Sequence, residues 1–423
     1  MSRSGSSDRP SGRPDPVPST TDDDVLSHPG PDATGSPADM TAPLDDGGGR
    51  WRRHLVSART AFAATWIPWL VARVITLGAV WIARSQVHAL RKGNGAAAAA
   101  AHNGLLGFDA GWYRSIAVSG YGFSRPSLRF FPLYPLVDRF VSDATRLPIG
   151  ATLLLVSNAS AFVGAMLVHR VAARELGDDA TARRAVWLIC LAPPAYVFVM
   201  GYSESLFVVL AIATFLCIRS DRWAWAGLWG FLAATERPIG VLLFLPVAIE
   251  GARTWPGAGG VGRLARVTAV VAPIAGLVTY LSWVAATYGG FLSPIRLQRY
   301  GVARSISGDP FVNAFRDARA GLEGSHIGTA LHLPWIVLAL ALCVVAWRCL
   351  PTSYGVFAIA VVVAGLLGAN FASFERYALS AFPLTIAAAT LLQSRRVRIP
   401  VFVLCGVGLL GYGLLAFVNL NVP

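Results

Sequence analysis

The chain has 423 residues, of which 54% are hydrophobic and only 14% charged, and its formal net charge is +13. A soluble domain is about 45–50% apolar and about 25% charged, so this composition excludes an ordinary soluble globular protein. The basic residues are scattered over short segments between apolar stretches, a pattern that favours membrane insertion over nucleic-acid binding.

Residues 1–49 form a polar N-terminal segment that is rich in Pro, Gly, Ser and Asp. The segment contains nine Asp and three Arg and almost no large apolar residues, so it cannot bury enough surface to order itself. It also lacks the short apolar core of a signal peptide. We expect a disordered cytoplasmic tail over 1–49 and one transmembrane domain over 50–423; a tail that binds a partner is the alternative.

Apolar stretches that suit a hydrocarbon core of about 30 Å recur from residue 61 onwards. The sequence therefore predicts an all-α, polytopic transmembrane fold with about eleven spans. The expected spans are 61–83, 149–169, 186–200, 204–218, 223–235, 238–250, 267–287, 335–350, 354–371, 377–393 and 400–418.

Arginines concentrate in alternate loops, and such short basic loops stay in the cytoplasm. The N-terminus is then cytoplasmic and the C-terminus external, in a multi-pass protein of the plasma membrane. Two long loops, 84–148 and 288–334, fall on the outer side. The loops expected in the cytoplasm are 50–59, 170–185, 219–222, 253–266, 348 and 395–398.

One carboxylate, Asp109, stands among aromatic residues in the first outer loop. Phe108, Trp112 and Ile116 recur every four residues and form one apolar face, while Tyr113 follows Asp109 by one helical turn. Aromatic rings can cover the apolar faces of sugars, and a carboxylate can take the proton of an acceptor hydroxyl. The pattern therefore indicates sugar chemistry at a membrane surface.

A structural role for Asp109 is the alternative. An aspartate commonly caps a helix through its side-chain oxygen, and glycine commonly ends one. Asp109 would then cap a helix over 110–118 that ends at Gly120.

Charged residues also lie at the ends of later spans. A guanidinium group binds phosphate through two parallel hydrogen bonds, which makes Arg237 and Arg376 candidate ligands of a lipid phosphate. The alternatives are interfacial anchors or pairs with the adjacent Glu236 and Glu375. Glu204 is expected to orient a hydroxyl, to pair with an arginine, or to cap the following helix.

We expect no protein-bound cofactor besides a lipid-linked sugar donor. His326 and His332 are six residues apart without a nearby pair of carboxylates, and we expect both on the surface. No glycine-rich loop for a soluble nucleotide is found. The sequence leaves a divalent metal open.

Six segments carry a resemblance to a known family. In chain order they are GFDAGWYRSIAVSGYG, RFFPLYPLV, GYSESLF, ATERPIGVLL, PIRLQRYGVAR and FERYALSAFPL. Together they resemble the family of the second mannosyltransferase of glycosylphosphatidylinositol assembly and its bacterial relatives, over about residues 60–395. That family belongs to the C-type glycosyltransferases, which are polytopic and use a polyprenyl-phosphate sugar as donor.

The resemblance implies transfer of mannose, with inversion, from polyprenyl-phosphate mannose to an extracytoplasmic glycolipid or glycan. It implies Asp109 as the general base. Phe108 replaces a tryptophan that is usual in the family, and Glu236 replaces a usual Thr or Ser. The candidate substrate-binding residues are Trp112, Tyr113, Tyr202, Glu204, Arg237, Gln298, Arg304, Arg376 and Tyr377.

Three other functions fit a polytopic chain. They are a flippase or transporter of a lipid-linked sugar, a glycan polymerase or ligase with a diphosphate-linked donor, and a scaffold without catalysis. Transporters tend to place paired repeats and charges near the bilayer midplane. Here the charges gather at span ends and in two long loops, which favours an enzyme.

Overall fold

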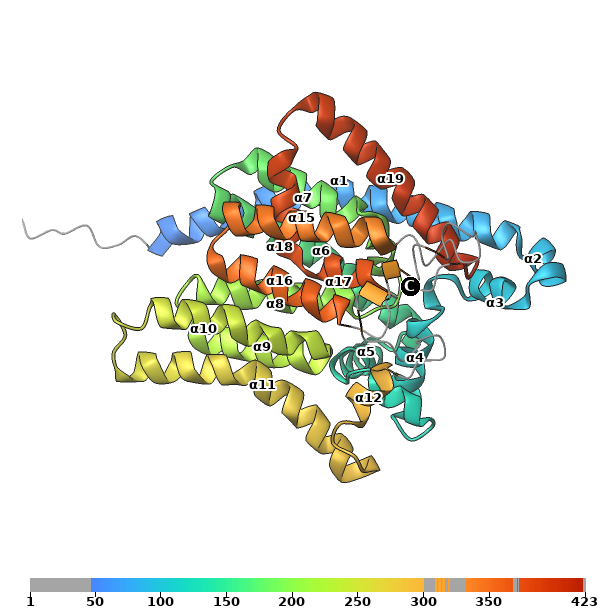
Figure 1. The fold of residues 1–423 in the computed structure, drawn as a ribbon, viewed down its shortest axis with the longest axis horizontal. Helices are drawn as coiled ribbons and strands as arrows, with labels where there is room; N and C mark the ends of the chain where they lie inside the picture. The colour runs from blue at the N-terminus through green and yellow to red at the C-terminus, as the bar shows by residue number, and fades with distance from the viewer. Residues whose placement is uncertain are drawn as a thin grey trace, which may run out of the picture. The chain divides into compact units, whose positions relative to one another are not determined.

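The computed structural model describes residues 47–299, 332–367 and 373–420, together with residues 309, 311, 312, 314, 315, 319 and 371. The chain divides into two units, Met1–Arg50 and Trp51–Pro423. The regular elements of the described residues are all helices, without a strand (Figure 1). The predicted all-α fold is therefore confirmed.

The helices have the following bounds. The α-helices are α1 Gly47–Ser85, α2 Val87–Gly93, α3 Gly95–Asn103, α4 Asp109–Ser119, α5 Leu133–Thr145, α6 Ile149–Leu176, α7 Asp179–Leu191, α8 Glu204–Ile218, α9 Trp223–Glu236, α10 Phe244–Arg253, α11 Gly260–Tyr288, α12 Ser293–Arg299, α15 His332–Cys349, α16 Thr352–Leu366, α17 Phe374–Ser380, α18 Phe382–Leu391 and α19 Arg395–Phe417. Four 3-10 helices join them: η1 Gly104–Leu106, η2 Arg125–Arg129, η3 Pro193–Phe198 and η4 Pro238–Leu243.

Five of the described helices are long and apolar enough to cross a membrane on their own. They are α1, over Ala58–Ser85, and the whole of α6, α11, α15 and α19. Shorter apolar helices, among them α8, α16 and α18, have 10 to 17 residues. A polytopic membrane protein is therefore confirmed, and the number of spans stays a prediction.

The third predicted span, 186–200, starts too late. Helix α7 begins at Asp179 because the side chain of Asp178 accepts hydrogen bonds from Ala180 N (2.9 Å) and Thr181 N (3.0 Å). It ends at Leu191, shortly before a Pro-Pro pair, since proline offers no N–H for a helical hydrogen bond. The chain then continues as η3.

The predicted span 377–393 consists of two helices, α17 and α18. The break falls at Ala381, just before a Phe-Pro pair that opens α18. The residue before a proline is disfavoured in the helical conformation, which explains an interruption near this point. As a result, Arg376 lies on a helix of its own, seven residues long.

The core of unit Trp51–Pro423 includes helix α8 and its neighbours. The fully buried ring of Phe215 on α8 contacts Tyr354 and Phe357 of α16 and Phe382 of α18, with ring centroids 4.5–5.4 Å apart.

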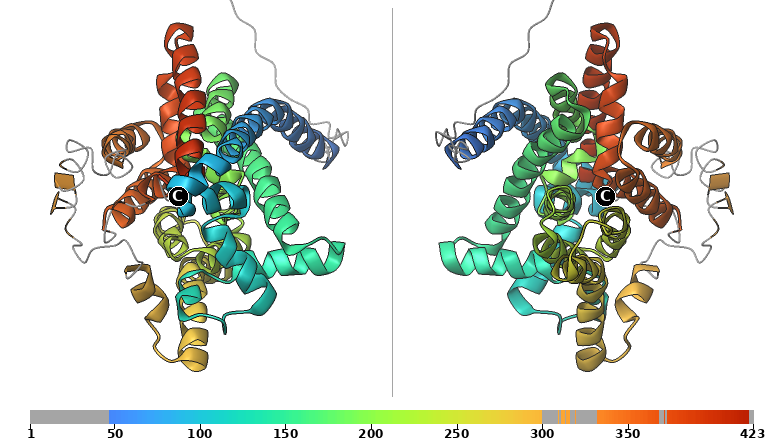
Figure 2. Two further views of the ribbon diagram at one scale, coloured as in Figure 1. Left: turned by 90° about the vertical axis from the view of Figure 1, so that its right-hand side faces the viewer. Right: turned by 90° about the vertical axis from the view of Figure 1, so that its left-hand side faces the viewer.

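Figure 1 shows α4, α5 and α12 at one end of the helices, which we call the loop end, and the α10–α11 connection at the other. Figure 2 shows the ribbon turned by 90°, with the right-hand side of Figure 1 facing the viewer in one view and its left-hand side in the other.

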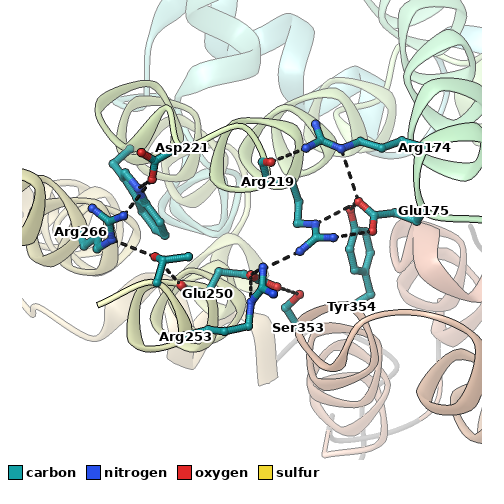
Figure 3. A network of polar contacts seen from close by, with 11 residues as sticks. Arg174, Glu175, Arg219, Asp221, Glu250, Arg253, Arg266, Ser353 and Tyr354 are labelled. Carbon is teal, nitrogen blue, oxygen red and sulfur yellow. Dashed lines mark hydrogen bonds and ion pairs between the residues drawn. The ribbon is translucent and has the colours of Figure 1, made fainter. Parts of the chain in front are cut away.

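A polar network joins several helices at the end opposite the loop end (Figure 3). Arg219, just after α8, donates from Nε and Nη2 to both oxygens of Glu175 on α6 (3.0 and 2.9 Å). Its Nη1 lies 3.6 Å from Oε2 of Glu250 on α10. Tyr354 and Ser353 of α16 donate to Glu175 (3.2 Å) and Glu250 (2.8 Å), respectively. We call Arg219, Glu175 and Glu250 the arginine clamp, because one side chain ties α6, α8 and α10 together.

Helix α5 in the first loop is amphipathic. Leu136 and Phe140 are exposed, whereas Asp138 is fully buried. Burial raises the pKa of Asp138 to about 6, and the nearby hydroxyl of Thr152 offsets this only in part. The carboxyl group is therefore protonated in the folded protein at mildly acidic pH.

We expect Asp138→Asn to stabilise the protein at pH 8. The folded pKa lies above the ordinary value, so the stabilising contribution of Asp138 is complete below about pH 4 and is lost as the pH rises through 6. Asn stays neutral, and the gain at pH 8 should be on the order of 2 kcal/mol. Thermal unfolding in detergent at pH 4.5 and pH 8 measures this. A gain of the same size in the exposed variant Asp143→Asn would contradict it.

Candidate active site

The structure places Asp109 at the start of α4 rather than in the cap position. Phe108 occupies that position with φ of 52°, and no side chain caps the helix. The helix ends at Gly120 as predicted, with φ of 70° and a hydrogen bond from its N–H to Ile116 O (2.8 Å). The cap interpretation of Asp109 is therefore wrong. A positive φ at a non-glycine residue costs about 1–3 kcal/mol and often occurs at functional sites.

The side chain of Asp109 binds an arginine from the far part of the chain. Its Oδ2 accepts a hydrogen bond from Nη1 of Arg376 on α17 (3.0 Å). The side chain of Asp109 is 24% exposed, against 8% for Arg376. The backbone N–H of Asp109 donates to the hydroxyl of Tyr202 (3.3 Å). A carboxylate that other molecules can reach is thus held by a buried cation.

Glu204, the first residue of α8, joins two arginines. Its side chain is fully buried, and Oε1 accepts hydrogen bonds from Nε (2.7 Å) and Nη2 of Arg376. Nη1 of Arg237, which follows α9, lies 2.7 Å from the same oxygen. A buried carboxylate is costly unless cations and hydrogen bonds compensate it, and here two guanidinium groups do so. We call Asp109, Glu204, Arg237 and Arg376 the charged cluster.

The alternative in which the arginines pair with the glutamates beside them in the sequence is wrong. Arg237 and Arg376 both converge on Glu204 instead. Glu236 is buried, and neither of its carboxyl oxygens has a hydrogen-bond partner in the described part of the chain.

Glu375 binds a histidine that the sequence placed on the surface. His332, the first residue of α15, is buried, and its Nδ1 lies 2.6 Å from Oε1 of Glu375. This pair joins α15 to α17 directly beside Arg376. The surface assignment of His332 was wrong because its partner is 43 residues away in the sequence.

Two tyrosines lie under the guanidinium groups. The ring centroid of Tyr202 is 4.8 Å from Cζ of Arg376, and the ring centroid of Tyr377 is 5.7 Å from Cζ of Arg237. Cations are attracted to aromatic faces at such distances. Tyr202 and Tyr377, two of the three predicted tyrosines, therefore lie at the charged cluster, where they support the arginines.

Tyr113 and Trp112 lie in an aromatic cluster beneath α4. The hydroxyl of Tyr113 donates to Oγ of Ser203 (2.8 Å), and its ring meets Phe130 and Tyr134 edge-on. Burial, helped by the negative charges of Glu204 and Asp109, raises the pKa of Tyr113 well above its usual value. Tyr113 therefore stays protonated and acts as a hydrogen-bond donor.

Trp112 stacks on Phe130 and Phe123, with centroids 5.6 and 5.9 Å apart. The guanidinium of Arg129 lies 5.5 Å from its ring centroid. Of the face predicted along α4, Trp112 and Ile116 pack in this cluster, whereas Phe108 lies just before the helix and packs against another part of the core.

Two candidate residues, Gln298 and Arg304, come from the second long loop, and the structure describes only the first. Gln298 lies on α12, and its Nε2 donates to the carbonyl oxygen of Arg129 (2.6 Å), which links this loop to the first one. Arg304 lies outside the described residues. Sequence reasoning did not single out Ser203, although it stands between Tyr202 and Glu204 in the GYSES segment.

The charged cluster has two positive and two negative side chains, so its formal charge is balanced. Asp109 is its most exposed member, and Glu204 its least. A hydroxyl group could approach Asp109, and an anion could bind an arginine by replacing Asp109. The arrangement can therefore combine proton removal with phosphate binding.

Residues 94–244 match the family described as Mannosyltransferase (PIG-V). The match covers about a third of the chain, which is similar to the PIG-V mannosyltransferases over that segment. The GPI mannosyltransferase 2 of Drosophila pseudoobscura pseudoobscura is 29% identical over 130 residues, which cover 28% of this chain and 28% of that protein. The chain thus matches less than a third of the length of this curated relative. The predicted resemblance to this family is confirmed over residues 94–244, which contain four of the six segments.

The PIG-V segment contains three of the four residues of the charged cluster: Asp109, Glu204 and Arg237. Arg376 lies 132 residues beyond the end of the segment. The fold nevertheless brings it into contact with two of the three.

Proposed function

We propose that the protein is a membrane mannosyltransferase that moves mannose from polyprenyl-phosphate mannose to a hydroxyl of an extracytoplasmic glycolipid or glycan. The observation that carries this proposal is the contact between Asp109 and Arg376. In this contact a partly exposed carboxylate inside the PIG-V segment lies beside a guanidinium group from outside it. Membrane-spanning helices on the same chain suit a lipid-linked donor.

In the proposed reaction Asp109 accepts the proton of the acceptor hydroxyl. The hydroxyl oxygen forms a bond to the anomeric carbon of mannose from the face opposite the phosphate. The bond between that carbon and the phosphate oxygen breaks, so the configuration inverts. Polyprenyl phosphate leaves with one more negative charge, which Arg376 and Arg237 stabilise.

The donor and the base share Arg376 in this mechanism. Asp109 occupies Nη1 of Arg376 in the structure. A donor phosphate at this arginine would replace Asp109 and leave the carboxylate free to accept a proton. Glu204 keeps the guanidinium in place during the exchange, since it binds Nε and Nη2.

The direct test is transfer by the purified protein in liposomes that contain polyprenyl-phosphate [³H]mannose and a membrane acceptor fraction. We expect labelled acceptor and equimolar polyprenyl phosphate. Movement of intact donor between leaflets without cleavage would instead support a transporter. Label that arises only from a diphosphate-linked donor would support a polymerase or ligase.

Arg237 offers a test of phosphate binding. Arg237→Ala should raise the KM for the lipid donor more than Arg237→Lys, because lysine keeps the charge but loses the two-pronged geometry. The acceptor KM should change little in both variants. Donor titrations at saturating acceptor measure the difference. Wild-type rates and donor KM in both variants would restrict Arg237 to anchoring Glu204.

The side of the membrane is a further prediction. In a cysteine-free background, a cysteine at Arg114 on α4 should react with an impermeant maleimide from outside intact cells. A cysteine at Gly260, at the start of α11, should react only after permeabilisation. The opposite result would place the charged cluster at the cytoplasmic face and contradict an extracytoplasmic acceptor.

A further inference from the structure

An arginine lies buried within the first helix that is long enough to cross the membrane. Arg73 is only 7% exposed and falls inside Ala58–Ser85, the part of α1 that has the length and hydropathy of a span. No carboxylate among the described residues forms an ion pair with it. A charged side chain inside a membrane segment is costly and commonly marks a functional site, so its partners are informative.

The guanidinium group of Arg73 is bonded to amide and backbone oxygens instead of a carboxylate. Nε donates to Oδ1 of Asn158 on α6 (3.0 Å), Nη2 to the carbonyl oxygen of Phe198 (3.2 Å) and Nη1 to that of Trp69 (3.4 Å). Its Cζ lies 4.3 Å from the ring centroid of Trp69, a distance at which a cation is attracted to an aromatic face. Arg73 thus ties α1 to α6 and to the end of η3.

The chain beyond η3 depends on such side-chain bonds. Phe198 ends η3, and residues 199–203 then reach α8 without regular structure, although all of them are buried. Buried carbonyl groups need hydrogen-bond partners, and outside a helix side chains must supply many of them. Arg73 donates to the carbonyl oxygen of Phe198, and Nδ2 of Asn158 donates to that of Val199 (3.1 Å).

Two serines extend this attachment. Oγ of Ser157 on α6 also donates to the carbonyl oxygen of Phe198 (3.4 Å). Oγ of Ser205 on α8 donates to the carbonyl oxygen of Ser157 (2.8 Å). We call Arg73, Ser157, Asn158 and Ser205 the anchor residues, because together they hold both ends of the segment 198–205.

Gly201 marks the point where the anchored segment meets the first long loop. Its N–H donates to the carbonyl oxygen of Leu105 in η1 (3.1 Å). A Cβ atom at this glycine would lie 3.1 Å from Cβ of Leu153 and 3.4 Å from Cβ of Ala110. The segment is therefore packed closely between α6 and the start of α4, and a shift of the segment would be passed on to both.

The next three residues contact the candidate active site. The hydroxyl of Tyr202 accepts a hydrogen bond from the backbone N–H of Asp109 (3.3 Å). Oγ of Ser203 accepts one from Tyr113 (2.8 Å), and Glu204 binds both arginines of the charged cluster. The position of the anchored segment thus sets the position of the exposed carboxylate and of the buried one.

We propose that Arg73 is a positioning residue for mannosyl transfer, which it serves by fixing the segment 198–205 from within the membrane. This rests on the proposed function. Arg73 contacts none of the charged cluster and acts through Phe198 and Asn158. The competing account is that Arg73 only stabilises the packing of α1.

Kinetics separate the two accounts. Arg73→Met should lower kcat by about 10²-fold, the effect of misplacing a catalytic group by about 1 Å. Arg73→Lys keeps the cation but loses the fork, so it should recover part of kcat. Asn158→Ala, a milder change in the same attachment, should show a smaller loss.

The matched control is Arg184→Met. Arg184 on α7 is likewise 7% exposed, and its Nε donates to the carbonyl oxygen of Ala389 on α18 (3.2 Å), away from the anchored segment. This variant should lower the melting temperature and leave kcat of the folded protein unchanged. An equal change of kcat in Arg73→Met and Arg184→Met would overturn the proposal.

Hydrogen exchange tests the attachment without requiring transfer. The amide of Gly201 should exchange faster in Arg73→Met than in the wild type, and at the wild-type rate in Arg184→Met, since local opening follows the loss of local bonds. Unchanged exchange in Arg73→Met would overturn the attachment, and faster exchange with wild-type kcat would overturn its role in transfer. Faster exchange in Arg73→Met, when the wild type transfers no mannose, would refute the proposed function and keep the attachment.

Discussion

Asp109→Asn should lower mannosyl transfer by about 10²–10⁴-fold, the usual contribution of a positioned general base. Asn has nearly the shape of Asp but cannot accept the proton of the acceptor hydroxyl. The helix should persist, since the side chain of Asp109 does not cap α4 and its hydrogen bond to Arg376 can be kept by an amide oxygen. Initial rates with polyprenyl-phosphate mannose, in protein of wild-type melting temperature, measure the loss.

The same variant should bind the product polyprenyl phosphate more tightly than the wild type. Asp109 competes with phosphate for Nη1 of Arg376, and Asn removes the competing negative charge. Lost transfer together with stronger product binding would be hard to obtain from a misfolded site. Microscale thermophoresis in detergent can compare the two dissociation constants.

Two further variants complete this test. Asp109→Glu keeps the charge but moves it by about 1 Å, a displacement that can cost about 10²-fold. Asp143→Asn removes an exposed carboxylate of the same loop and should transfer at the wild-type rate. Near-normal transfer by Asp109→Asn would end the assignment of Asp109 as the base.

Arg219→Met should destabilise the protein by about 3 kcal/mol, because two buried carboxylates lose the cation that they share. Glu175 and Glu250 are each 4% exposed, and Arg219 contacts both. Glu250 keeps Arg253 at 2.8 Å, whereas Glu175 keeps only the longer contact with Arg174 at 3.8 Å, so Glu175 should account for most of the loss. Thermal unfolding in detergent measures the effect.

The control for the clamp is Arg183→Met. Arg183 pairs with Asp179 on the surface of α7, where both side chains are about half exposed, and such a pair contributes about 0.3–0.5 kcal/mol. If Arg219→Met melts at the temperature of this control, the arginine clamp does not hold the helices together.

The helices and several of their ends could be predicted from local sequence. Gly120 ends α4 because a glycine tolerates positive φ, and the apolar stretches give the long helices. The start of α7 was missed although Asp178 provides an ordinary cap. The predicted start at residue 186 was based on hydropathy, and the first turns of α7 are too polar to be recognised in that way.

The partners within the site could not be predicted. Asp109 and Arg376 are 267 residues apart, and no local pattern shows which helix ends meet. Local sequence offered Glu236 as an alternative partner for Arg237, because neighbouring residues are the pairs that a sequence displays, and it offered Glu204 a partner arginine without saying which one. Side chains that are adjacent in the sequence point in different directions in the fold. Arg237 and Arg376 both form ion pairs with Glu204.

The shortness of α8 and α9 has a consequence for the depth of the charged cluster. With 15 and 14 residues these helices are about 21–22 Å long, against a hydrocarbon thickness of about 30 Å. Their connection carries Arg219, Asp221 and Arg222, which belong at the polar surface of the membrane. If α8 and α9 cross the membrane, Glu204 and Arg237 at their opposite ends lie several ångströms below the other surface. Hydrophobic mismatch makes membranes thin around short elements, so in the proposed reaction a thinned bilayer would bring the acceptor hydroxyl down to the lipid-linked donor.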